Sequence, residues 1–358
     1  MIKSILLISL AFFTSFTASA HTEDFIVGPS KRLEFIRDRK LVQTSVPDSA
    51  LADPCKARIR GLLCLVDSWK EGEERVCLAG GESYAPKLIE VYDGLPPKMQ
   101  KLFCTMKVIF VEKNLGSLAY AGTNGVDEKG AFDAVMGIRE SLLTQDYAIN
   151  DVFGWKEQKA FGVQAPPFQV LPGSPLVKAK VSGKNSALQY VLIHEIAHIL
   201  DFTNNANEFV CKTGEDCETP QDWDETFGRK FEPVAKSWSA LSWNNWVDPN
   251  PQHNFALHKD LCFYGCTGKG LNLLQMPEFY RQLNAVEYIT TYAAVSPMED
   301  FAESSAFHFL SQKAGFEYHV TDPEATYFLN RKWYAMKDKR EWIENFYAQD
   351  LKYPRIKN

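Results

Sequence analysis

The sequence lacks basic runs, internal repeats and low-complexity tracts, and after its first twenty residues it has no apolar run long enough to cross a membrane. The absence of basic runs, together with a formal net charge of −6, argues against a nucleic acid as partner. The absence of long apolar runs argues against stable insertion in a membrane. The 358 residues are 45% hydrophobic, which is enough to bury a sizeable core in one large domain or in two.

The first twenty residues, MIKSILLISLAFFTSFTASA, have the pattern of a secretory signal. Lys3 provides the positive start, the stretch from Ile5 to Phe13 is apolar, and small residues lead up to Ala20. The apolar stretch is too short and too rich in Ser and Thr for a membrane anchor, and no cysteine follows it to carry a lipid. We therefore expect cleavage of residues 1–20 after Ala20 and a mature chain that is secreted or periplasmic.

Eight cysteines fall into two groups of four along the chain. An even number of cysteines in an exported chain predicts disulfides, and we expect pairing within each group. A zinc-binding cysteine cluster is the alternative, but the stretch CFYGC from residue 262 to 266 has no second close pair. The first group is Cys55, Cys64, Cys77 and Cys104, and the second is Cys211, Cys217, Cys262 and Cys266.

Hydrophobic periodicity predicts both helices and strands. Residues 53–101 read as short helices, for example in CKARIRGLLCLVDSW, and MKVIFVEKN alternates like a strand. After a Gly-rich loop, AFDAVMGIRESLL predicts a second strand, and residues 162–178 are Pro-rich and loop-like. The strongest helical pattern is KNSALQYVLIHEIAHILDF, with Asn185 or Ser186 as N-cap.

A further helix is predicted in the C-terminal third of the chain. The stretch TYAAVSPMEDFAESSAFHFLSQ begins as a loop and becomes helical, with Ser296 as cap and Pro297 at the first position. The tail from residue 322 is expected to be helical and to pack the aromatic side chains Trp333, Tyr334 and Trp342.

The strongest helix carries an H-E-x-x-H motif. His194 and His198 lie one turn apart on one face, so their imidazoles can bind a single zinc ion. The carboxylate of Glu195 can take a proton from a metal-bound water. A pair of satisfied core histidines is the alternative, but the neighbours are apolar, and histidines buried there are costly unless something binds them.

The third metal ligand is not part of this motif. The extension H-x-x-G-x-x-H is absent, because position 204 is Asn. Glu218, with Asp222 four residues later, has a spacing similar to that of thermolysin, but it lies between Cys217 and a Thr-Pro helix start, in a turn.

Glu299 and Glu303 are better candidates for the third ligand, since they lie one turn apart on the second helix. One carboxylate can bind zinc while the other holds a ligand imidazole through its free N–H. Tyr292 precedes Glu299 by seven residues, and its phenol can stabilise the oxyanion that forms from a polarised peptide carbonyl.

The motifs HEIAHILD and YAAVSPMEDFAE resemble those of the gluzincins grouped around Mlc titration factor A and the catalytic domain of anthrax lethal factor, a scheme shared with the clostridial Pro-Pro endopeptidases. The resemblance implies a zincin-like fold with Zn²⁺ held by His194, His198 and Glu299. It further implies the roles of the remaining site residues: Glu195 as general base, Tyr292 as oxyanion partner, Glu303 as the carboxylate behind a ligand, and Asp201 as the Asp that closes the helix motif.

The resemblance also divides the chain. Residues 21–105 match nothing in those families and are expected to form a Cys-rich, mostly helical region, either a propeptide or an accessory domain. Residues 106–358 are expected to form an α+β, zincin-like catalytic domain with a small mixed sheet, an active-site helix and a helical C-terminal part. The motifs lie 101 residues apart (299 − 198), which leaves room for a disulfide-containing insertion at about 203–286.

The expected function is that of an exported zinc metallopeptidase, endopeptidase or aminopeptidase, acting on a peptide or protein. The alternative is a retired zincin scaffold that serves as a secreted binding or inhibitory protein. Retired enzymes commonly lose the base or the oxyanion partner, and Glu195 and Tyr292 are both present. The other histidines of the chain are interpreted as structural or surface residues: His253, His258, His308 and His319.

Overall fold

The computed structural model describes residues 54–67, 76–124, 133–217, 225–263 and 270–354. Within these ranges helices alternate with small sheets, which confirms the α+β class. The expected signal peptide lies outside the described residues, as do Cys266, Glu218 and Asp222. In the part of the chain that is described, no helix is both long enough and apolar enough to span a membrane.

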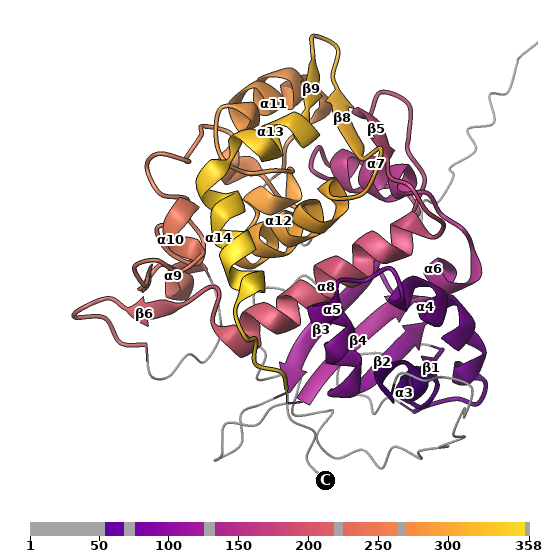
Figure 1. Cartoon of the computed structure of the whole chain (residues 1–358). Helices are drawn as coiled ribbons and strands as arrows, with labels where there is room; N and C mark the ends of the chain where they lie inside the picture. The colour runs from indigo at the N-terminus through magenta and orange to yellow at the C-terminus, as the bar shows by residue number, and fades with distance from the viewer. Residues whose placement is uncertain (1–53, 68–75, 125–132, 218–224, 264–269, 355–358) are drawn as a thin grey trace, which may run out of the picture.

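Residues 54–144 form the sheet lobe, drawn in indigo to magenta in Figure 1. Its four-stranded sheet has the order β1-β2-β4-β3, in which β1 and β4 run parallel to β2 and β3 runs antiparallel to β4. The elements are α3 (Pro54–Leu62), β1 (Leu63–Val66), η1 (Gly81–Tyr84), α4 (Ala85–Tyr92), α5 (Pro97–Gln100), η2 (Lys101–Cys104), β2 (Met106–Glu112), β3 (Ala119–Asn124), β4 (Asp133–Arg139) and α6 (Glu140–Thr144).

The sheet lobe contains two strands that the sequence pattern did not predict. The stretch CKARIRGLLCLVDSW is helical only as far as Leu62, and Leu63–Val66 pairs with β2 instead. The Gly-rich loop before β4 contains β3, an edge strand. Both strands gain their hydrogen bonds from residues far away in the sequence, and local periodicity does not report such partners. Because β1 pairs with β2, the sheet crosses the domain boundary expected at residue 105.

Residues 149–180 and 205–348 form the helical lobe, in which a three-stranded sheet of order β5-β8-β9 and a two-stranded sheet of β6 and β7 lie among helices. Trp333 is fully buried here and Trp342 partly so, whereas Tyr334, expected to pack, is 54% exposed. The elements are α7 (Ile149–Lys159), β5 (Leu176–Lys180), β6 (Phe209–Cys211), α9 (Glu225–Gly228), β7 (Phe231–Pro233), α10 (Ser239–Ser242), η3 (His258–Asp260), η4 (Leu273–Gln275), α11 (Met276–Asn284), η5 (Tyr292–Ala294), α12 (Pro297–Ser311), β8 (Glu317–Thr321), β9 (Thr326–Phe328), α13 (Leu329–Ala335) and α14 (Lys337–Ala348).

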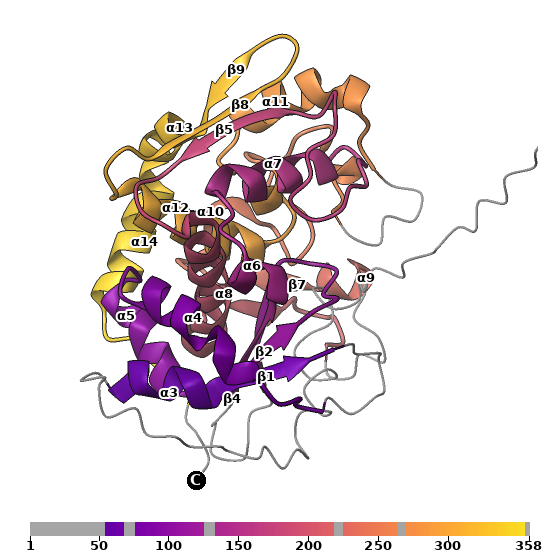
Figure 2. The ribbon, with the colours of Figure 1, turned by 90° about the vertical axis from the view of Figure 1, so that its right-hand side faces the viewer.

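Helix α8 (Ser186–Asn204) runs between the two lobes, as Figure 1 and Figure 2 both show. It contacts β3 on one side and α12 on the other, and of its 19 residues only Phe202 and Asn204 are not buried. A helix that is apolar all round belongs in the core of a protein. The polar side chains that α8 carries therefore need partners inside the molecule.

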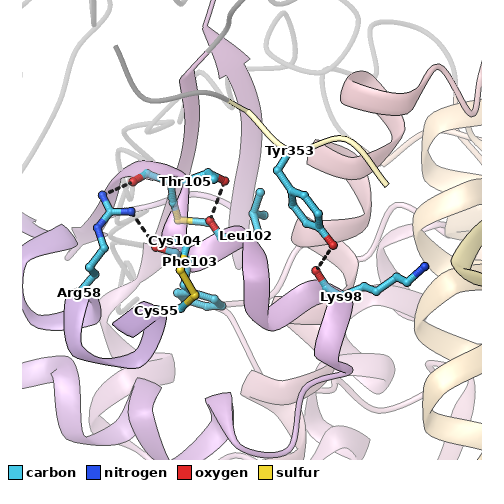
Figure 3. Close-up of a disulfide and its surroundings, with 9 residues drawn as sticks. Cys55, Arg58, Lys98, Leu102, Phe103, Cys104, Thr105 and Tyr353 are labelled. Atoms are coloured by element: carbon cyan, nitrogen blue, oxygen red, sulfur yellow. Dashed lines mark hydrogen bonds between the residues drawn. A yellow bond between two sulfur atoms is a disulfide. The ribbon is translucent and has the colours of Figure 1, made fainter. Parts of the chain in front are cut away.

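Three disulfides join cysteines within the two groups, as expected: Cys55–Cys104, Cys64–Cys77 and Cys211–Cys217. Cys262 is also disulfide-bonded, and its partner lies outside the described residues. The first disulfide ties α3 to the end of η2, directly before β2 (Figure 3). Near the C-terminus, the hydroxyl of Tyr353 donates a hydrogen bond to the carbonyl oxygen of Lys98 at 2.9 Å, so Tyr353 lies against the sheet lobe (Figure 3).

Candidate metal centre

The three expected metal ligands come together where α8 packs against α12. His194 and His198 are one turn apart on α8, and their Nε2 atoms are 3.2 Å apart. Glu299 lies in the first turn of α12, and its Oε2 atom is 3.0 Å from Nε2 of His194 and 3.5 Å from Nε2 of His198. Among the described residues this is the one group of three His, Cys, Asp or Glu side chains that can hold a metal ion.

The start of α12 is built as its sequence predicts. Ser296 is the N-cap, and its side chain accepts a hydrogen bond from the backbone N–H of Glu299 at 3.2 Å. Pro297 occupies the first helical position, where its missing N–H costs nothing. The N–H of Glu299 itself donates the capping hydrogen bond. The N-cap residue Ser296 therefore also fixes the backbone of the third candidate ligand.

The geometry of the three atoms fits a zinc ion. Bonds of about 2.0–2.1 Å in a tetrahedral site place neighbouring ligand atoms about 3.3–3.4 Å apart, close to the three separations found here. Oε2 of Glu299 is buried and accepts no well-aligned hydrogen bond from the described residues. An orphaned carboxylate oxygen facing two imidazole nitrogens is costly without a cation.

Glu303 lies beside His194, next to the ring nitrogen that does not face Glu299. Its Oε1 atom lies 2.8 Å from Nδ1 of His194 and accepts hydrogen bonds from the Lys156 ammonium, at 2.8 Å, and from the hydroxyl of Tyr190. Its Oε2 atom accepts a hydrogen bond from the hydroxyl of Thr290 at 2.8 Å. A fully buried carboxylate with this many donors is immobile, so it fixes the orientation of the His194 ring.

Asp201 is placed differently from Glu303. Its carboxylate accepts hydrogen bonds from the backbone N–H of Asn207 at 2.8 Å and from the side-chain amide of Asn207 at 2.7 Å. That amide also donates to the carbonyl oxygen of Pro297 at 3.1 Å. Asp201 therefore ties the end of α8 to the start of α12.

A small pocket of about 30 Å³, large enough for one or two water molecules, is lined by His194, one of the three candidate ligands. Glu195 and Tyr292 both line it, and Oε2 of Glu195 is buried without a hydrogen-bond partner among the described residues. The Tyr292 ring lies beside the His194 ring, with centroids 5.9 Å apart. The remaining lining residues come from the segment that enters β3, from α7 and from α8: Ser117, Leu118, Ala119, Lys156, Tyr190, Val191 and His194.

The electrostatics of the site favour a positive charge at its centre. Burial lowers the pKa of His194, but the carboxylates of Glu299 and Glu303 outweigh it and raise this pKa to about 9. Burial raises the pKa of Glu303, yet Lys156 and His194 bring it down to about 2. The pKa of Glu299 is likewise lowered, because His198 and His194 outweigh burial. Burial raises the pKa of Glu195 above its usual range.

Sequence reasoning missed several residues that support the site. Tyr190 is four residues before His194 on the same helix, so helical spacing alone points to it. Lys156, Thr290 and Asn207 carry no such signal, because they reach the site from other elements. The histidines interpreted as structural lie outside the group of ligands, and His258 bonds the carbonyl oxygen of Ala294 at 2.8 Å.

The chain matches no protein-family model, no curated protein and no solved structure.

Proposed function

We propose that this chain is an exported, zinc-dependent metallopeptidase of the gluzincin type, with a zincin-like fold, that hydrolyses bonds in a peptide or protein. One observation carries the proposal: the ligand atoms of His194, His198 and Glu299 have a spacing close to that of a tetrahedral zinc site, and His194 lines a pocket together with Glu195 and Tyr292. The resemblance of the two motifs to those of the gluzincins supports it. The disulfides agree with an oxidising, extracytoplasmic compartment.

Each residue around the pocket has a distinct task in such a reaction. Zinc, when bound, polarises a peptide carbonyl and lowers the pKa of a water molecule. Glu195, which lines the same pocket, would take the proton from that water and pass it to the departing amine. Burial raises the pKa of Glu195, which suits both transfers. The hydroxyl of Tyr292 donates a hydrogen bond to the carbonyl oxygen as negative charge develops there. Glu303 keeps His194 in orientation.

A secreted binding or inhibitory protein built on a retired zincin scaffold is the second candidate. A retired site has no use for an unpaired carboxylate beside the metal ligands. Oε2 of Glu195 is such a group, buried and without a hydrogen-bond donor among the described residues. A buried acceptor of this kind costs stability, which favours the enzyme.

The test is hydrolysis of an unfolded protein and a peptide library by the zinc-loaded mature chain, with and without a chelator. We expect cleavage that the chelator abolishes. Glu195→Gln should keep zinc and thermal stability while turnover falls by roughly 10² to 10⁴, because an amide does not accept the proton. Glu157→Gln is the matched control, since Glu157 is also buried and its carboxylate accepts hydrogen bonds from the hydroxyls of Tyr280 and Tyr318, neither of which lines the pocket.

The outcomes separate the two candidates. A wild-type chain that binds zinc and cleaves nothing supports the binding protein. A Glu195→Gln variant that turns over as fast as the Glu157→Gln control contradicts the role of Glu195 as the base.

A further inference from the structure

Lys156 is a buried lysine on α7 that contacts both Glu303, which lies beside the candidate ligand His194, and Tyr292, the proposed oxyanion donor. Its side chain is 10% exposed, and its ammonium lies 2.8 Å from Oε1 of Glu303 and 2.5 Å from the hydroxyl of Tyr190. The same ammonium lies over the ring of Tyr292, 4.1 Å from its centroid. Lys156 also lines the pocket with His194.

The contact with Tyr292 is of a kind that fixes a ring. A cation over an aromatic face is attracted by the ring quadrupole, and more strongly where water is excluded. Tyr292 lies in η5, a single 3-10 turn, so its own element gives its side chain little support. Besides Lys156, the ring of Phe263 packs against it edge-on with centroids 4.8 Å apart, and the His194 ring lies alongside.

A second buried lysine, Lys339, has similar surroundings but lies away from the pocket, so it serves as a comparison for Lys156. Lys339 pairs with Asp300 of α12 at 2.6 Å and lies over the rings of Tyr288 and Trp238, at 4.8 and 5.2 Å. It resembles Lys156 in burial, in its carboxylate partner on α12 and in its aromatic neighbours. It differs in one respect, because none of these neighbours lines the pocket.

We propose that Lys156 is a positioning residue of the catalytic site. Its ammonium holds the phenol of Tyr292 over the reacting carbonyl and, through Glu303, holds the imidazole of His194. It does not touch the substrate. This inference rests on the proposed peptidase function, since it concerns the placement of the oxyanion donor.

The first test compares Lys156→Met with Lys339→Met in the full mature chain. With a cleavable peptide from the library, Lys156→Met should lower kcat by roughly tenfold to a hundredfold, up to the loss typical of one oxyanion donor, with KM within about threefold. Zinc affinity, measured by chelator competition, should stay within about tenfold, because Glu303 keeps its other donors. Lys339→Met should lose thermal stability while the folded protein keeps kcat.

A double-variant cycle tests whether Lys156 acts through Tyr292. In the Tyr292→Phe background there is no hydroxyl to place, so adding Lys156→Met should lower kcat by less than about threefold more. If the Met variant does not fold, Lys156→Arg, which keeps a cation but moves it, is measured in the same cycle.

Three results would overturn the inference. The first is full activity of Lys156→Met, and the second is a loss that multiplies fully with that of Tyr292→Phe. The third is a fall in kcat that follows the loss of zinc in parallel, which would make Lys156 a support of the metal site only. A wild-type chain without hydrolysis overturns the proposed function and this inference with it, and is distinguishable from all three.

Discussion

The two sides of α12 bury neighbouring carboxylates in contrasting ways. On one side, Asp300 is paired with Lys339 at 2.6 Å and accepts a hydrogen bond from the indole of Trp243 at 3.1 Å. On the other side, Glu299 faces only His194 and His198. Asp300 receives its positive charge from within the fold, and Glu299 has no lysine or arginine within ion-pair distance among the described residues. We infer that the first arrangement serves stability and the second is made for a bound cation.

The largest expected effect tests the Asp300 side. Lys339→Met leaves a buried carboxylate without its cation and should lower the free energy of unfolding by about 3–5 kcal/mol. Zinc stoichiometry should not change. Chemical denaturation and metal analysis measure the two quantities. Removing both charges in Lys339→Met/Asp300→Asn should restore part of the stability. A Lys339→Met variant that stays stable but loses zinc would contradict the assignment of Asp300 to stability and of Glu299 to metal binding.

The next effect belongs to the Glu299 side and concerns turnover only. Tyr292→Phe removes the hydroxyl that is expected to stabilise the oxyanion and keeps the ring. We expect kcat at least tenfold lower, with losses of this kind reaching roughly 10² to 10³, while zinc content and melting temperature stay as in the wild type. Steady-state kinetics and thermal melting decide this, and unchanged kcat would remove Tyr292 from the mechanism.

Glu303 combines features of Asp300 and Glu299. Like Asp300 it is paired with a lysine, here Lys156, and like Glu299 it contacts the candidate ligand His194. Glu303→Gln should weaken zinc binding by about 10- to 100-fold, the usual cost of losing the carboxylate behind a ligand imidazole. Chelator competition provides the measurement. Asp300→Asn, whose carboxylate pairs with Lys339 and contacts no candidate ligand, should leave zinc affinity unchanged, and equal effects of the two variants would contradict the division of roles.

The smallest effect, when taken for a single pH unit, is a dependence of zinc affinity on pH. The pKa of His194 is raised to about 9 in the protein chain itself, where the pull of Glu299 and Glu303 exceeds the opposing effect of burial. Below pH 9 zinc must displace this proton, so its association constant should rise about tenfold per pH unit and level off above pH 9. Calorimetry in buffers of different ionisation enthalpy should detect about one proton released per zinc at pH 7, and an affinity independent of pH between 6 and 8 would be inconsistent with this coupling.

Local signals in the sequence predicted the two helices of the site. Ser296 and Pro297 mark the start of α12, and the spacing of His194 and His198 places both on one face of α8. These features depend on neighbours within a turn, so a single sequence is sufficient to find them.

Long-range features were not predictable in the same way. Strands β1 and β3 owe their existence to partners across the sheet, and short apolar or Gly-containing stretches do not identify those partners. Lys156 and Thr290 reach Glu303 from elements 147 and 13 residues away in the chain. A buried lysine has no periodicity of its own, so its contact with Glu303 is seen only in the folded chain.

The most direct test of the account is metal analysis of the purified mature chain beside Glu299→Gln and Asp300→Asn. The two variants change neighbouring carboxylates to amides, one on each side of α12. We expect one tightly bound zinc per chain in the wild type and in Asp300→Asn, and almost none in Glu299→Gln, because a neutral amide is a poor zinc ligand. A wild-type chain without zinc, or a Glu299→Gln variant with a full complement of it, would contradict the assignment of His194, His198 and Glu299 as the metal centre.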